Sequence, residues 1–316
     1  MNKFIKRICL TSAAAILLVG PTVNSVVPAV NVEAKSKTRR HKKKLRIQQA
    51  TMVLPAGYTR EELQHAISAT YDPNTKHYVI NKPSSAFLQA CMKGVQINNF
   101  NRSNVVESAS DQVKVNPTKL TRDQQAEITS FALRLINQAR NCFNLSPWLP
   151  SDNTQKLAED IADEYTQNKK SIFGMQGHYV DGIVRACKKN GLNTVDDNYI
   201  EDMTGFEDSK KITITELKKQ VYEGIKDMLF GFSGDDYSKK EINDRKSYDE
   251  WLHARALLTT VSKDRAREGK SYDNETFYFG LSISRIRDEY SVHFIDVSTY
   301  FFTGKYAAIT GTTFKP

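Results

Sequence analysis

The sequence predicts an α+β fold in which several helices precede an antiparallel pair of strands. Apolar residues recur at helical spacing over 128–143 and again over 217–229. The pattern then changes, because apolar residues alternate with small or polar ones over 277–284, as in a half-buried strand. Helices followed by a hairpin are typical of α+β proteins and not of a doubly wound parallel sheet.

Residues 1–34 have the pattern of a secretory signal peptide. A basic stretch over 2–7 precedes an apolar stretch over 8–19, which is too short to span a membrane comfortably. Small residues follow, so we expect cleavage after Ala34, with Ala29 as the second choice. No second apolar stretch of membrane length and no LPxTG-type sorting signal is evident in the sequence. We therefore expect an exported protein, secreted or held non-covalently at the cell wall, without a transmembrane anchor.

Residues 35–50 form a basic arm that carries most of the formal net charge of +9. A block of like charges does not fold alone and is usually an interaction arm. For an exported protein the available polyanions are wall teichoic acid, anionic lipid and extracellular nucleic acid, and binding to any of them would weaken with salt. A solvated spacer is the alternative. The residues expected to bind polyanions are Lys35, Lys37, Arg39, Arg40, Lys42, Lys43, Lys44 and Arg46.

A small N-terminal segment over 51–110 and a linker over 111–119 are expected between the arm and the main domain. Thr59 can cap a short helix, because Glu61 and Glu62 occupy the first helical turn. The elements expected in this segment are a helix over 60–70, a strand over 78–80 and a second helix over 84–93.

The main domain is expected over 120–302, followed by a C-terminal tail over 303–316. Thr121 with Gln124, and Thr213 with Glu216, have the spacing of capping boxes that begin helices. The helices expected in this domain cover 121–143, about 152–168, about 181–190, 213–230 and 251–258. Residues 231–247 are polar and rich in turn residues, and the two strands cover 277–284 and 290–300.

Three cysteines follow the signal peptide, and none belongs to a CxxC pattern. An odd number argues against a disulfide framework. Cys142 and Cys187 fall on apolar faces of expected helices, so we expect buried thiols there, with a Cys142–Cys187 bridge as the less favoured alternative. Nothing in the sequence assigns a role to Cys91.

The common catalytic signatures HExxH, GxSxG and GxxxxGK[ST] are absent from the sequence. Histidines and carboxylates of the main domain therefore become the candidates for chemistry. His178 precedes the third expected helix and His253 lies in the short helix over 251–258, while Glu201 lies between them. Spacing alone favours the alternative that these histidines are surface or capping imidazoles. His293 is expected to be a histidine on the face of the last strand.

The order of several short motifs carries a resemblance to a known family. The motifs are Leu135–Arg140, Gly177-His178, Gly191-Leu192, Glu201-Asp202, Leu217-Lys218, Met228–Phe230, His253-Ala254, Leu257-Leu258 and the terminal strand pair. In this order the sequence resembles the CAP superfamily of cysteine-rich secretory, antigen 5 and pathogenesis-related proteins. It resembles most the bacterial SEC10/PgrA surface exclusion branch of Gram-positive bacteria such as lactobacilli. The resemblance covers about 120–302.

This resemblance implies an α-β-α sandwich with a cleft that holds two histidines and two acidic residues. By position, His178 and His253 are the histidine pair, Glu201 is the first acid and Glu223 is the second. Two neutral imidazoles suit a divalent metal such as zinc, and the carboxylates would orient them. The sequence departs from the eukaryotic pattern because it lacks the GHYTQ-type signature and the disulfides.

The same resemblance implies a non-enzymatic function first. Such a protein limits redundant conjugative plasmid transfer by binding or masking a surface protein or ligand of a neighbouring cell. One alternative is a metal-dependent extracellular hydrolase that acts on wall or peptide substrates. Another is an adhesin or lipid-binding module using Tyr300, Phe301, Phe302 and Tyr306, although ordinary core packing is preferred for these aromatic residues. A specific nucleic-acid partner is disfavoured by the signal peptide.

Overall fold

In the computed structural model, the described residues are 50–72, 74, 76–100, 109–174, 177–193, 200–208, 211–258 and 275–316. The expected signal peptide and the eight basic residues of the arm lie outside these ranges.

A mixed four-stranded sheet forms the centre of the fold. Its strand order is β4 (Leu149–Pro150), β7 (Phe277–Ile286), β8 (Glu289–Ser298) and β5 (Glu201–Glu207). β7 and β8 are the expected antiparallel hairpin, in which Leu281 pairs with Phe294. β4 runs parallel to β7, whereas β5 runs antiparallel to β8. The strand β5 was not expected, because its acidic start hides the alternation that identifies a strand.

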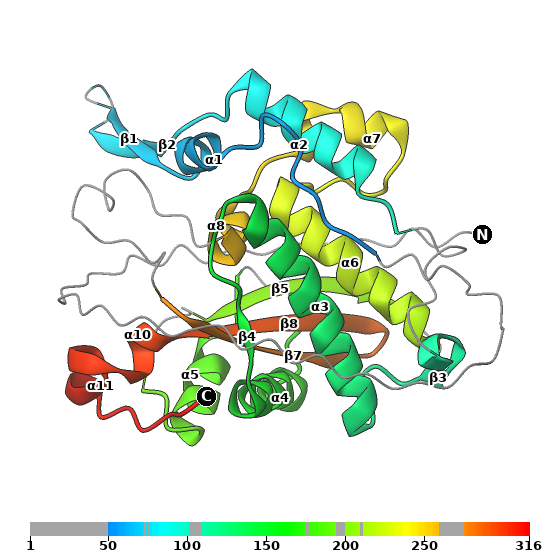
Figure 1. The fold of residues 1–316 in the computed structure, drawn as a ribbon, viewed down its shortest axis with the longest axis vertical. Coiled ribbons are helices and arrows are strands. Elements are labelled where there is room, and N and C mark those ends of the chain that lie inside the picture. The colour runs from blue at the N-terminus through cyan, green and yellow to red at the C-terminus, as the bar shows by residue number, and fades with distance from the viewer. Residues whose placement is uncertain are drawn as a thin grey trace, which may run out of the picture.

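Helices cover both faces of this sheet, which confirms the expected α-β-α sandwich (Figure 1). The helices α3 (Arg122–Cys142), α6 (Ile214–Phe230) and α8 (Leu252–Leu258) lie on one side. The helices α4 (Asp152–Gln167) and α5 (Val180–Lys189) lie on the other.

Both expected capping boxes are present at the starts of the two long helices. The Thr121 hydroxyl accepts from the Gln124 backbone, and the Gln124 side chain accepts from the Thr121 backbone N–H. Thr213 and Glu216 do the same for α6. The helix α6 ends at Gly231, whose φ of 66° lies in the left-handed region that favours glycine.

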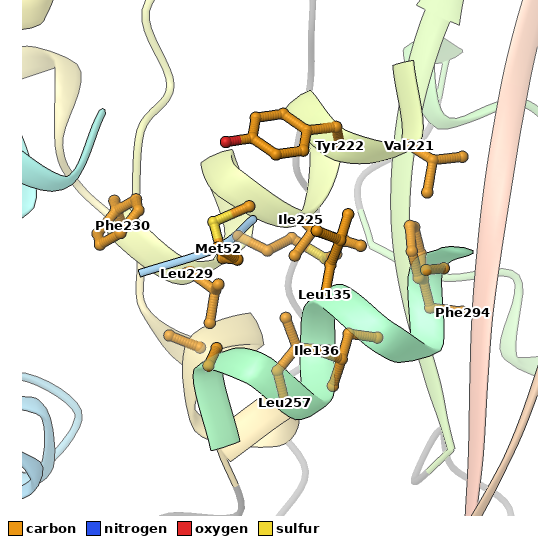
Figure 2. Packing of buried hydrophobic residues seen from close by; sticks show 14 of the residues in the cluster. Met52, Leu135, Ile136, Val221, Tyr222, Ile225, Leu229, Phe230, Leu257 and Phe294 are labelled. Atoms are coloured by element: carbon orange, nitrogen blue, oxygen red, sulfur yellow. The ribbon is translucent and has the colours of Figure 1, made fainter. Parts of the chain in front are cut away.

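The larger hydrophobic core lies between the sheet and the helices α3, α6 and α8 (Figure 2). Leu135 and Ile136 of α3 face Val221 and Ile225 of α6, and all four side chains are at most 1% exposed. Full burial of one such side chain contributes about 1.5–3 kcal/mol to folding. The helical spacing that predicted α3 and α6 therefore also selects the residues that join them.

The N-terminal segment packs onto this core. It contains α1 (Arg60–Ala66), β1 (Ala69–Asp72), β2 (His77–Ile80) and α2 (Ser85–Ile97). The Tyr58 ring lies 5.0 Å from Phe87 and 5.5 Å from Phe230 of α6, and its hydroxyl donates to the Leu229 carbonyl. This segment and the sandwich therefore share one continuous core.

The expected linker is also packed against the sandwich. A 3-10 turn over Ala109–Gln112 precedes β3 (Lys114–Val115), which pairs with β6 (Ile212–Thr213). Lys218 of α6 donates to Asp111 at 2.7 Å and to Glu127 of α3 at 2.8 Å. Because the ammonium group of Lys218 is buried, these two carboxylates balance its charge in the interior.

The C-terminal region is helical beyond the sheet. The second strand ends at Ser298, and α10 (Thr299–Phe302) and α11 (Gly304–Thr310) follow. Phe301 and Phe314 are buried in the smaller core on the α4 and α5 side. Tyr300, Phe302 and Tyr306 are half-buried against the same core, which supports packing over lipid binding for these rings.

Other elements are short. In the polar stretch after α6, α7 (Lys239–Asn243) precedes a 3-10 turn over Arg245–Ser247, and another 3-10 turn covers Ile172–Gly174. No helix among the described residues is long and apolar enough to cross a membrane.

The three described cysteines are free thiols, so Cys142 and Cys187 form no bridge. Cys187 is buried as expected, and Cys91 is buried as well. The expectation of a buried thiol is wrong for Cys142, which is exposed. It is the last residue of α3.

Candidate functional site

The carboxylate of Glu201 is the centre of a buried polar cluster. Glu201 is the first residue of β5, and His178 lies just before α5. The Nδ1 atom of His178 lies 2.6 Å from Oε2 of Glu201, and both side chains are almost inaccessible to solvent. The structure therefore brings together these two residues, which lie 23 positions apart in the sequence.

Two further side chains bind the same carboxylate. Nδ1 of His293 lies 2.7 Å from Oε1 of Glu201. The hydroxyl of Tyr165, from α4, donates to Oε2 at 2.7 Å and accepts from the backbone N–H of Tyr179 at 2.8 Å. Burial would raise the pKa of Glu201, but hydrogen bonds with His178 and His293 hold it at about 2. Glu201 is therefore a carboxylate at neutral pH.

His293 lies on the face of β8, as the sequence predicted, and is fully buried. Its Nε2 atom lies 2.8 Å from the hydroxyl of Ser284 on the neighbouring strand β7. The chain Ser284, His293 and Glu201 has the connectivity of a serine hydrolase triad. However, Ser284 is 1% exposed and His293 is 0% exposed, so neither side chain is accessible to a substrate.

The second histidine of the expected pair approaches His178 from α8. The ring centroids of His178 and His253 are 6.4 Å apart. Nδ1 of His253 lies 2.6 Å from Oε2 of Glu250, which precedes it by one helical turn. His178 is 8% and His253 is 2% exposed, so the alternative of surface imidazoles is not what the structure shows.

Glu223, the expected second acid, has a cationic partner on its own helix. Its Oε1 atom lies 3.1 Å from Nζ of Lys219, one turn earlier in α6. The carboxylate that contacts His253 is Glu250, which sequence reasoning missed. The signal for it was present, because Glu250 and His253 have the i,i+3 spacing of neighbours on a helical surface.

Two more carboxyl groups lie buried near this cluster on β5 and β8. Burial, together with the charge of Asp296, raises the pKa of Asp202 well above its usual value. Burial likewise raises the pKa of Asp296 to about 8, although Arg140 opposes the shift. The carboxyl group of Asp296 is therefore protonated through much of the neutral range. Within the described part of the chain, Oδ2 of Asp202 has no hydrogen-bond partner.

The histidine pair supplies two nitrogen donors that suit a metal ion. A carboxylate only accepts hydrogen bonds, so the Nδ1 atoms of His178 and His253 carry the protons. Each Nε2 then has a lone pair, and Nε2 of His253 is buried without a hydrogen-bond partner among the described residues. This carboxylate–histidine arrangement is the one that metal-binding histidines use. Among the described residues, no group of three or more His, Cys, Asp or Glu side chains is arranged to hold a metal ion.

Comparisons with known proteins support the architecture of the chain but assign no function to it. No family model matches the sequence, and no curated protein matches it. Among solved structures, the CAP domain of enterococcal PrgA matches with a TM-score of 0.50 and 21% sequence identity. The match covers 77% of this chain and 91% of that domain. The chain has a CAP-like fold. At 21% identity the likeness concerns the fold alone and assigns no role to the residues of the site.

Proposed function

We propose that this chain is an exported, cell-envelope-associated CAP-like protein of the surface exclusion type. The observation that carries the proposal is the match to the CAP domain of enterococcal PrgA, which extends over most of that domain. The signal-peptide pattern over 1–34 supports a location outside the cytoplasm. In this role the protein binds or masks a surface component of a neighbouring cell and so limits redundant plasmid transfer.

In this proposal the basic arm over 35–50 holds the protein to wall teichoic acid. Its eight lysine and arginine side chains would bind phosphate groups with release of counterions. A variant in which these eight residues are replaced by glutamine is the matched control, because the folded domain is unchanged. We expect salt to wash the natural chain from cells and the variant to appear in the medium. Retention of the variant on cells would contradict this role of the arm.

The function itself is tested by conjugation into recipient cells that do or do not express the chain. We expect a lower transfer frequency into expressing recipients. The arm variant should restore transfer, since it leaves the recipient surface. Equal transfer frequencies into recipients that display the natural chain and recipients that lack it would refute the exclusion proposal.

A second candidate function is divalent metal binding for extracellular hydrolysis. The observation that favours it is the unpartnered Nε2 atom of His253 next to the ring of His178. His178 and His253 would hold the ion through Nε2, while Glu201 and Glu250 fix the two rings through Nδ1. When bound, a zinc ion would supply Lewis acidity and an activated water toward wall or peptide substrates.

Zinc content after metal exposure and desalting tests this candidate. We expect near-stoichiometric zinc in the natural chain and its loss in both His178→Ala and His253→Ala. His65→Ala is a matched control, because His65 lies in α1, outside the site. Zinc retained equally by all variants would place the metal elsewhere and exclude this pair as its ligands.

A further inference from the structure

The carboxylate of Glu201 connects His178 to a second histidine, His293. Oε2 of Glu201 binds His178, and Oε1 binds His293. His293 belongs to the central strand β8, and its side chain lies under α4, where the ring of Tyr165 is 4.5 Å away. His293 and His178 therefore share Glu201 as a hydrogen-bond partner, although His293 does not belong to the pair formed by His178 and His253.

The hydrogen bonds determine which ring nitrogen of each histidine carries a proton. Because ionised Glu201 only accepts, Nδ1 of His178 and Nδ1 of His293 both donate to it. In neutral His293, Nε2 then accepts from the Ser284 hydroxyl, 2.8 Å away. Ser284 thereby favours the tautomer of His293 that donates to Glu201.

Loss of the His293 donor would leave Oε1 of Glu201 as a buried charge without this partner. Burial strongly disfavours a carboxylate that lacks compensating hydrogen bonds. Rotation of Glu201 would satisfy Oε1 only by breaking the bond to His178 or to Tyr165, since both share Oε2. The orientation of the His178 ring therefore depends on a hydrogen bond made at the other end of the carboxylate.

We propose that His293, supported by Ser284, is a positioning residue that fixes the tautomer and orientation of His178 through Glu201. Its consequence is that Nδ1 of His178 stays protonated and Nε2 stays unprotonated. The consequence for metal affinity rests on the second candidate function, whereas the effect on the His178 ring does not.

Two amide variants provide a matched pair. Asn at position 293 retains an N–H near the position of Nδ1, which faces Glu201. Gln retains one near the position of Nε2, which faces Ser284. Both are polar and similar in size, so a difference between them reports which end of the ring matters. Circular dichroism and thermal unfolding first establish that both variants fold.

The direct readout is nitrogen NMR of the full chain with labelled histidine. In the natural chain we expect the His178 ring to show a protonated Nδ1 and an unprotonated Nε2. His293→Asn should keep this signature, whereas His293→Gln should convert His178 to mixed tautomers. An unchanged His178 signature in folded His293→Gln would overturn the proposal. If His293→Gln fails to fold, Tyr165→Phe removes another donor to Glu201 and should perturb the same signals; unchanged signals would again overturn it.

Zinc affinity, measured by calorimetric titration of the same proteins, gives the second readout. Changes in residues that orient metal ligands typically lower affinity about 10–100-fold. We expect a decrease of this size for His293→Gln and near-natural affinity for His293→Asn. If the natural chain binds no zinc while the NMR result holds, the metal-binding function fails and the positioning role stands. Equal zinc affinity in the natural chain and both variants would overturn the predicted consequence for the metal site.

Discussion

Asp296 should make the folded protein less stable as the pH rises toward 8. Burial raises its pKa from 3.8 to about 8 in the folded chain. Between these values the folded state keeps a proton that the unfolded state releases. The free energy of unfolding therefore decreases with rising pH, and the stabilising contribution is complete only below the unfolded pKa.

The size of the effect follows from the width of this window. One proton of difference changes the free energy of unfolding by about 1.4 kcal/mol per pH unit. Over the roughly four units of the window this sums to an upper bound of about 6 kcal/mol. Asp202 on the neighbouring strand is shifted in the same direction, so the natural chain should show a still steeper decline.

Asp296→Asn removes the titrating proton while preserving the shape of the side chain. We expect urea unfolding between about pH 5 and about pH 8 to give a slope that is shallower by about 1.4 kcal/mol per unit. At about pH 8 the variant should be more stable than the natural chain. A slope identical to that of the natural chain would refute a neutral, buried Asp296.

Asp160→Asn is the control for this measurement. Burial opposes ionisation of Asp160, but hydrogen bonds from Lys156, Lys189 and Asn190 lower its pKa overall. Its contribution is therefore present above the unfolded pKa and is lost only as the pH falls through the lower folded value. We expect Asp160→Asn to shift stability equally at all pH values of the titration and to leave the slope unchanged.

Three further predictions concern packing and accessibility. Leu135→Ala should lower the free energy of unfolding by about 2–5 kcal/mol in urea titration, since it opens a cavity between α3 and α6. A loss below that range would mean that the core closes around the cavity. Gly231→Ala should also destabilise the chain in urea, because φ is +66° and a Cβ atom would lie 2.6 Å from a backbone oxygen; unchanged stability would contradict the strain. A thiol reagent should modify Cys142 in the folded chain and reach Cys91 and Cys187 only after unfolding; equal rates for all three would contradict their burial.

Local sequence signals predicted most of the longer helices and strands, because these signals arise from residues a few positions apart. The capping pattern at Thr121 and the apolar spacing after it define α3 without reference to the rest of the chain. The strand β5 escaped this reasoning. Glu201 and Asp202 are acidic yet buried at its start, and their burial depends on partners that lie far away in the sequence.

In the candidate site, too, contacts between residues close in sequence could be predicted and contacts between distant residues could not. Glu250 could have been assigned to His253, since the two are one helical turn apart. His293 could not have been assigned to Glu201, because 92 residues separate them. Their contact follows from the pairing of β5 with β8, in which Met203 lies opposite His293. Only the register of that pairing places the imidazole within reach of the carboxylate.

Two buried polar atoms near Glu201 bear on whether this cluster binds a ligand. The carboxylate of Glu201 has hydrogen-bond partners in Tyr165, His178 and His293, as expected for a polar group that stabilises the interior. Nε2 of His253 and Oδ2 of Asp202 differ, because both are buried and no described residue hydrogen-bonds to them. Each such atom costs the folded state about 1–3 kcal/mol. Natural proteins often keep costs of this kind at functional sites, which agrees with the metal-binding candidate that uses Nε2 of His253.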